Sequence, residues 1–398
     1  MSRFSIPTVL RSVPRDLLAD FFESYGHQGL VDLCRVSPPA EPDDLMIWME
    51  GNLNQDQFDA LEAGLHEVCD LACESGINAL IEAAFESGHF DFAPELPDGG
   101  WYHKSMWCLI RHKLIFVKAL LIHEIGSYSF WRKRTDLPKR PLQLDRNKQT
   151  DLREKVIDVF MEHQGRGRNG SVFCVSRKGI DYVIVYLDDF LLDLQFHDEK
   201  GKLVSGHVRP AFHVVYAFNP SEGSLEVYAP KVPAKVKLLL EQAFATVTLG
   251  VELPPWNTRS AYELDQLKDR SFSLATDPED AIRVRISRLR LSALTTSRRI
   301  LLDASSDGKS DDVYEMMEHY LDAREFPKSQ FHITQATLRF EFLPLPGRKP
   351  GSASFDVTWP NTCNLRNQRP ERVSVIQKYL KRWKIDRSES IEPAAVES

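Results

Sequence analysis

Cysteine and long apolar runs are scarce in this chain. Only 6 of its 398 residues are cysteine and no spacing between them repeats, which excludes a small disulfide-based protein and favours reduced thiols in a cytoplasmic protein. The most apolar stretch, Leu109–Ile125, contains several charged residues, so we expect a core helix and no membrane span. The opening segment, Phe4–Leu10, is too short and too polar for a signal peptide.

Positive charge is also scarce in one part of the chain. The first hundred residues contain no lysine, 4 arginines and 19 acidic residues, whereas the remainder holds 46 basic and 38 acidic residues. Such a split favours either a polyanionic partner for the basic part or contact between the two parts. The overall composition, 42% hydrophobic and 27% charged, is that of a folded protein, and the length predicts two or three domains.

Several catalytic signatures are missing. The sequence contains no GxSxG, HExxH or GxxxxGK[ST] motif, so nothing predicts a serine hydrolase, a zinc protease or a P-loop enzyme. Gly165–Gly170 fits GxGxxG, but the pattern predicts a helix before it and a strand after it. A dinucleotide site needs the reverse order, and a basic linker is the better interpretation.

Apolar periodicity divides the chain into a helical part and a strand-rich part. Spacings of three and four residues predict helices over much of the first 164 residues. From Gly165 onward, runs of branched and aromatic residues predict strands, including Tyr182–Leu187. Two hairpins are each followed by a helix: Phe212–Phe218 with Ser224–Ala229, and Ile333–Leu343 with Ala353–Trp359.

We therefore predict an α+β fold, a helical N-terminal region followed by a β-rich region with two hairpin-plus-helix units. The predicted segments are an acidic helical region at 1–100, a helical region with a basic connection at 101–164, a β-meander plus helix at 165–252, a second α+β unit at 253–385, and a disordered tail at 386–398.

One short motif suggests metal chemistry. Tyr186-Leu187-Asp188-Asp189 lies between two apolar runs and resembles the strand–turn–strand of reverse transcriptases. That resemblance implies that Asp188 and Asp189 hold Mg²⁺ for phosphoryl chemistry. It covers about ten residues, and the helical region upstream supplies no convincing further aspartate. The simpler interpretation is that the two aspartates form a turn.

Basic clusters are the strongest remaining signal. Ala281–Ile300 contains six arginines and no acidic residue, and a change of alternation around Ser287 suggests a β-bulge. Arginine suits phosphate because its guanidinium binds in a bidentate way. The candidate nucleic-acid-binding residues are Arg132, Lys133, Arg134, Lys139, Arg140, Arg166, Arg168, Arg283, Arg285, Arg288, Arg290, Lys381 and Arg382.

The leading functional hypothesis is a non-enzymatic binding or accessory protein whose basic part contacts nucleic acid or an acidic protein surface. The same clusters would also suit pairing with the acidic N-terminal region, within the chain or in a homo-oligomer. Two alternatives are a Mg²⁺-dependent enzyme acting on phosphodiesters or nucleotides through Asp188 and Asp189, and a structural subunit of a larger complex. No other cofactor is predicted.

Overall fold

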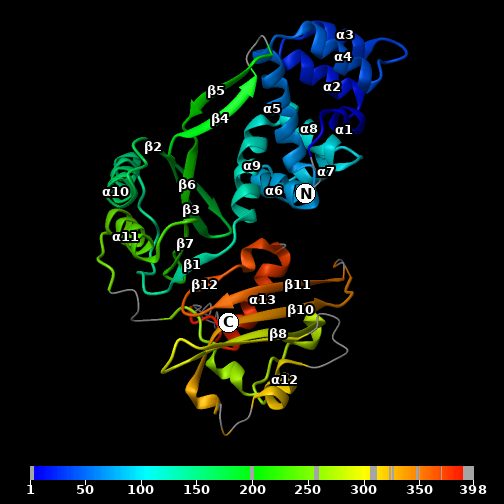
Figure 1. The fold of residues 1–398 in the computed structure, drawn as a ribbon. Coiled ribbons are helices and arrows are strands. Elements are labelled where there is room, and N and C mark those ends of the chain that lie inside the picture. The colour runs from blue at the N-terminus through cyan, green and yellow to red at the C-terminus, as the bar shows by residue number, and fades with distance from the viewer. Residues whose placement is uncertain are drawn as a thin grey trace, which may run out of the picture. The chain divides into compact units, whose positions relative to one another are not determined.

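Helices form the first third of the chain and an antiparallel sheet dominates the rest, which is the predicted α+β class (Figure 1). The computed structural model describes residues 4–197, 201–254, 260–304, 312–321, 324, 327–346, 348, 350–368 and 370–388. Two compact units result, one built mainly from residues up to Ser127 and the other mainly from Tyr128 onward. The predicted boundaries at residues 100 and 164 fall inside these units. The segment before 100 shares its core with the helix that follows it.

The first unit is a bundle whose apolar helix faces meet in one core. Phe21, Phe22, Leu65, Leu80 and Phe116 are fully buried there. The described helices are α1 (Ile6–Ser12), α2 (Arg15–Ser24), α3 (Gln28–Arg35), α4 (Pro42–Asn52), α5 (Gln55–Leu71), α6 (Glu74–Phe85), α7 (Phe92–Glu95), α8 (Trp101–Arg111) and α9 (Lys113–Ser127).

Polar residues decide where these helices begin and end. Asn54 and Gln57 form a capping box at the start of α5, each side chain accepting a hydrogen bond from the other's backbone amide. The apolar stretch 109–125 is divided between α8 and α9 at His112. In the described part of the chain, no helix is both long and apolar enough to cross a membrane.

The second unit contains a sheet of ten strands in the order β2-β3-β6-β7-β1-β12-β11-β10-β8-β9. All the described pairings are antiparallel. The strands are β1 (Trp131–Arg134), β2 (Gly170–Arg177), β3 (Ile180–Asp188), β6 (Ala211–Asn219), β7 (Ser224–Tyr228), β8 (Ile282–Ala293), β9 (Arg299–Asp303), β10 (Phe331–Phe342), β11 (Gly351–Thr358) and β12 (Thr362–Cys363).

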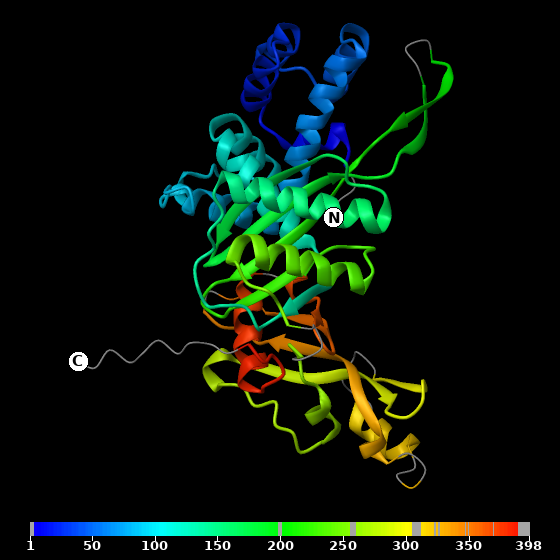
Figure 2. The same ribbon diagram turned by 90° about the vertical axis from the view of Figure 1, so that its left-hand side faces the viewer.

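Helices cover one face of the first half of this sheet. Helices α10 (Arg146–Gln164) and α11 (Ala234–Phe244) lie side by side over the strands, as Figures 1 and 2 show. Val185, Tyr216 and Val227 alternate onto that face and pack with Phe160 and Phe244. A π-helical turn, η1 (Ala245–Leu249), extends α11.

The second half of the sheet is covered on the opposite face. Leu338, Phe340 and Phe355 pack against Tyr379 of α13 and against Trp383, the first residue after that helix. The remaining elements here are α12 (Val313–Tyr320), α13 (Pro370–Arg382) and the 3₁₀ turns η2 (Asp265–Lys268), η3 (Pro278–Asp280), η4 (Lys328–Gln330) and η5 (Leu365–Asn367). Both predicted hairpin-plus-helix units are thus present.

A two-stranded ribbon extends the hairpin of β3 and β6. Its strands, β4 (Leu192–His197) and β5 (Leu203–Val208), pair with each other in a separate sheet. Leu192, Leu194 and Phe196 share one side of β4 and are about half exposed. The ribbon therefore carries apolar side chains outside the core.

Strand β1 joins the two halves of the sheet and carries three buried cations. It pairs with β7 on one side and β12 on the other. Arg132 Nε lies 2.6 Å from Glu241 Oε1, and Arg134 Nη1 lies 3.2 Å from Glu241 Oε2. Glu241 is fully buried on α11. Lys133 points to the other face of the sheet, where its Nζ donates to Asp386 Oδ2 at 2.7 Å.

Removal of the shared carboxylate is expected to destabilise the second unit. In Glu241→Ala, buried Arg132 loses its main counter-charge and Arg134 loses one of its two carboxylate partners, so we expect the free energy of unfolding to fall by about 3–5 kcal/mol. Urea unfolding followed by tryptophan fluorescence measures this loss. Glu252→Ala removes an exposed carboxylate and should change the free energy by less than about 0.5 kcal/mol. Equal effects of the two substitutions would contradict the structural role of Glu241.

Candidate nucleic-acid interface

A β-bulge brings four arginines of β8 onto one face of the sheet. Arg288 pairs with Thr337 of β10, but the next partner, Leu338, lies opposite Ile286, so Ser287 is an extra residue. The core side chains change from even to odd numbers at this point, from Ile282 and Ile286 to Leu289 and Leu291. The bulge predicted at Ser287 is confirmed. As a result, Arg283, Arg285, Arg288 and Arg290 all lie on the face opposite the core.

A fifth arginine joins this set from the neighbouring strand. Arg339 of β10 is the direct cross-strand partner of Arg285. Like charges in that position are destabilising. Arg339 Nε lies 3.6 Å from Glu341 Oε1 on the same strand. The alternation of β10 was readable in the sequence, but the register that places Arg339 beside Arg285 was not.

Carboxylates balance this face only in part. Arg288 donates from Nε and Nη2 to Asp303 Oδ2 of β9, at 3.0 and 2.7 Å. Asp356 of β11 accepts from the Thr337 hydroxyl. Within the described parts of β8 to β11, this face carries six arginines and three carboxylates. They are Arg283, Arg285, Arg288, Arg290, Arg299 and Arg339, with Asp303, Glu341 and Asp356.

The arginine face, as we call these six arginines and their strands, is not covered by a described helix of the second unit. Helices α12 and α13 pack on the opposite face through Met317, Leu380 and their neighbours. Helices α10 and α11 cover only the other half of the sheet. Alternate residues of a strand are about 6.6 Å apart, so the guanidiniums form a row along β8.

The basic cluster of β1 occupies a different position. Arg132, Lys133 and Arg134 are only 5, 4 and 7% exposed. Their charges are balanced by Glu241, Asp136 and Asp386 within the second unit. These three residues therefore do not belong to the arginine face, and their charges are paired within the second unit.

The next four predicted residues are spread over the first half of the second unit. Lys139 and Arg168 are exposed. Arg140 donates to the carbonyl oxygen of Leu249. Arg166 is 9% exposed, lies over the Phe212 ring at 3.9 Å, and its Nη1 donates to Asp189 Oδ1 at 2.6 Å.

The last two predicted residues lie on α13, on the covered side of the sheet. Lys381 Nζ is 2.5 Å from Glu222 Oε1. Arg382 donates to both oxygens of Asp277, at 2.6 and 2.9 Å. Both cations have carboxylate partners in the second unit, whereas one interpretation of the sequence placed such partners in the acidic N-terminal region.

The paired aspartates lie at the end of β3, where that strand leads into the ribbon. The neighbours of β3 are β2 and β6, so the motif is not the hairpin that the resemblance implied. Asp188 Oδ2 accepts from Asn169 Nδ2 at 2.6 Å. Burial opposes ionisation of Asp189, but hydrogen bonds from Arg166 and the Phe190 amide hold its pKa below its usual value. Asp189 thus serves as the counter-ion of Arg166.

Neither metal-ligand geometry nor known relatives assign a function. Among the described residues, no group of three or more His, Cys, Asp or Glu side chains is placed to hold a metal ion. No model of a known protein family matches the chain, and no curated protein matches its sequence. The GxGxxG segment connects the end of α10 to β2, the order that the sequence predicts and the reverse of a dinucleotide site.

The buried pair of Lys133 and Asp386 should make stability sensitive to acid. Burial alone would raise the pKa of Asp386, but the Lys133 ammonium and hydrogen bonds from Ser388 hold it below its usual value. The resulting stabilisation is present above the unfolded pKa of about 3.9 and is lost as the pH falls through the lower folded pKa.

Asp386→Asn should therefore melt at a lower temperature than the wild type at pH 7, and the two melting temperatures should converge as the pH falls below about 4. Thermal unfolding followed by circular dichroism between pH 7 and 3 measures both. A difference that stays constant down to pH 3 would show that the ionised carboxylate is not its source.

Proposed function

We propose that this protein binds nucleic acid through the arginine face, as a non-enzymatic binding or accessory protein. The observation that carries the proposal is the bulge at Ser287, which aligns four arginines of β8 on one face of the sheet beside Arg339. Without that extra residue, the second pair of arginines would point into the core. Guanidinium groups bind phosphate in a bidentate way, so a phosphate backbone matches this row.

The charge balance of the face supports a polyanionic partner. Arg285 and Arg339 lie directly opposite each other, so a phosphate group between them would contact both guanidiniums. Three carboxylates on the same face limit the excess charge and favour moderate, salt-dependent binding over very tight binding.

The chemistry of the face favours contacts to the sugar–phosphate backbone over base recognition. The side chains of β8 on this face are arginines and serines, and no aromatic ring among them offers a stacking surface. Backbone contacts position a nucleic acid but do not read its sequence. We therefore propose binding with little sequence preference. Reduced thiols, with six cysteines free in the structure, suit our further proposal of a cytoplasmic location.

The double substitution Arg285→Glu/Arg290→Glu tests the proposal. Glutamate at position 285 forms a favourable cross-strand pair with Arg339, so the melting temperature should not fall. Affinity for a labelled single-stranded oligonucleotide should fall at least about tenfold. The slope of log affinity against log salt should decrease in magnitude by about 1.4, since two contacts are lost. Fluorescence anisotropy at about 50 and 200 mM salt measures both quantities.

The matched control reverses the charge of two lysines that lie outside the arginine face. Lys155→Glu/Lys235→Glu changes the net charge equally, at exposed positions of α10 and α11. This control should bind as the wild type does. Equal losses in both double variants, or no loss in the first, would overturn the assignment of the arginine face.

The same samples separate the alternatives. After incubation with and without Mg²⁺, a denaturing gel should show intact oligonucleotide. Mg²⁺-dependent shortening that disappears in Asp188→Asn/Asp189→Asn would replace this proposal with the enzymatic one. Binding of polyglutamate but not of oligonucleotides would indicate an acidic protein partner instead.

A further inference from the structure

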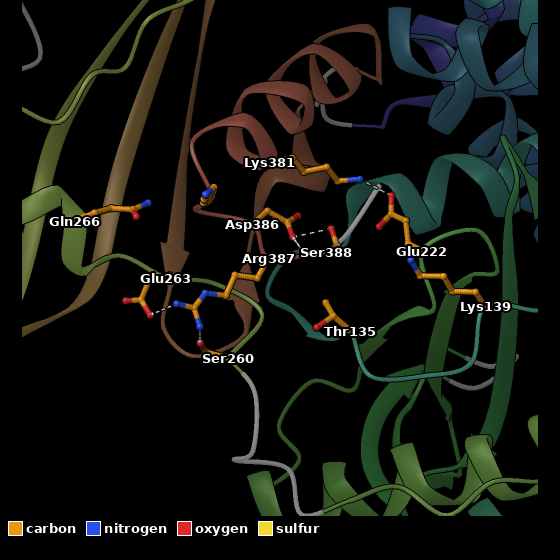
Figure 3. A pocket seen from close by; sticks show the side chains of 11 residues that line it. Thr135, Lys139, Glu222, Ser260, Glu263, Gln266, Lys381, Asp386, Arg387 and Ser388 are labelled. Atoms are coloured by element: carbon orange, nitrogen blue, oxygen red, sulfur yellow. Dashed lines mark hydrogen bonds and ion pairs between the residues drawn. The ribbon is translucent and has the colours of Figure 1, made fainter. Parts of the chain in front are cut away.

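A polar cavity of about 490 Å³ lies within the second unit, beside the C-terminal end of α13 (Figure 3). Its volume is in the range of small-molecule sites. Four separate segments contribute to it: the chain after β1, the turn between β6 and β7, the region around η2, and the end of α13 with the residues that follow. The last segment contributes Lys381, Lys384, Asp386, Arg387 and Ser388.

Every side chain that lines the cavity is polar or charged. None of these described lining residues carries an aromatic ring that would stack on a base. Hydroxyl groups of Thr135 and Ser260 and the amide of Gln266 supplement the charged groups. The charged groups and the lack of an aromatic ring among these residues favour a small, highly charged ligand over a nucleoside.

The carboxylates of the cavity already have cationic partners. Glu222 pairs with Lys381 at 2.5 Å, and Glu263 pairs with Arg387 at 2.9 Å. Asp386 is only 5% exposed and contacts Lys133, a cation behind the lining, at 2.7 Å. Ser388 stabilises this pair, since its hydroxyl donates to Asp386 and accepts from Lys133. With Lys384, these groups comprise four cations and three carboxylates, so positive charge is in excess.

Lys384 has an unusual backbone conformation. Its φ is 57°, in the left-handed region where glycine is favoured. The helix end requires this conformation, because the amides of Ile385 and Asp386 both turn back to donate to the Leu380 carbonyl. A lysine here is strained in a way that a glycine is not, so a glycine substitution at this position removes the charge without disturbing the helix end.

We propose that this cavity binds a small phosphate-bearing anion, with Lys384 as a binding residue and the Lys133–Asp386–Ser388 group as its rigid floor. The simplest probe of this chemistry is inorganic pyrophosphate. The site is separate from the arginine face, because it lies on the α13 side of the sheet. Its ligand is small and binds by charge and hydrogen bonding within a cavity of limited size.

The experiment uses isothermal titration calorimetry of the full chain with sodium pyrophosphate, in the presence of a chelator. The wild type should bind one pyrophosphate per chain. Lys384→Gly should lose at least about tenfold in affinity, because it loses one charge–phosphate contact. Its melting temperature should be unchanged or higher, since glycine relieves the backbone strain. A loss of binding therefore cannot be attributed to unfolding.

Lys231 provides a closely matched control. It is an exposed lysine with the same φ of 57°, and it does not line the cavity. Lys231→Gly removes one positive charge and relieves the same backbone strain as Lys384→Gly does. This variant should bind pyrophosphate as the wild type does. Arg285→Glu on the arginine face should also leave pyrophosphate binding unchanged.

Three results would overturn the proposal. The first is the absence of pyrophosphate binding to the wild type at millimolar concentration. The second is an equal loss of affinity in Lys384→Gly and Lys231→Gly, which would indicate a nonspecific effect of net charge. The third is tighter binding of citrate than of pyrophosphate, which would show that the cavity selects carboxylates.

Discussion

The sheet of the second unit depends on the ion pairs of β1, a short strand whose cations are buried on both faces. Arg132 and Arg134 point to Glu241 on one face, and Lys133 points to Asp386 on the other. A shift of register by one residue would move each cation to the face that lacks its partner. Buried ion pairs contribute little net stability, because desolvation costs about as much as attraction returns. Burial indeed raises the pKa of Glu241 despite its two guanidinium neighbours. We therefore interpret these pairs as setting the register that joins the two half-sheets.

This junction explains why the two halves of the sheet are covered on opposite faces. Neighbouring residues of β1 alternate between the side of α11 and the side of α13, so one strand contributes to both cores. The side that α10 and α11 leave uncovered over β8 to β11 becomes the arginine face. The side of α13 contains the polar cavity, whose floor is the pair formed by Lys133 and Asp386. Both candidate sites thus follow from one arrangement of helices, and each can be altered without the other.

Local patterns in the sequence predicted local structure well. Apolar periodicity located the helices of the first unit, and the change of alternation near Ser287 located the bulge of β8. The role of the β1 cations could not be predicted. Their partners Glu241 and Asp386 are 107 and 253 residues away from Arg134 and Lys133, so in the sequence they resemble a surface cluster. The tail predicted as disordered begins with Asp386, which is buried, and its positions beyond 388 lie outside the described residues.

A basic residue is available to an anionic ligand only to the extent that nearby carboxylates leave its charge unbalanced. Arg382 is exposed, but both oxygens of Asp277 accept from it, and a phosphate would have to compete with that bidentate pair. Arg285 differs, because its cross-strand neighbour is another arginine, so a phosphate bound there would contact two guanidiniums. The cross-strand register, which brings Arg339 beside Arg285, is not visible in a count of charges along the chain.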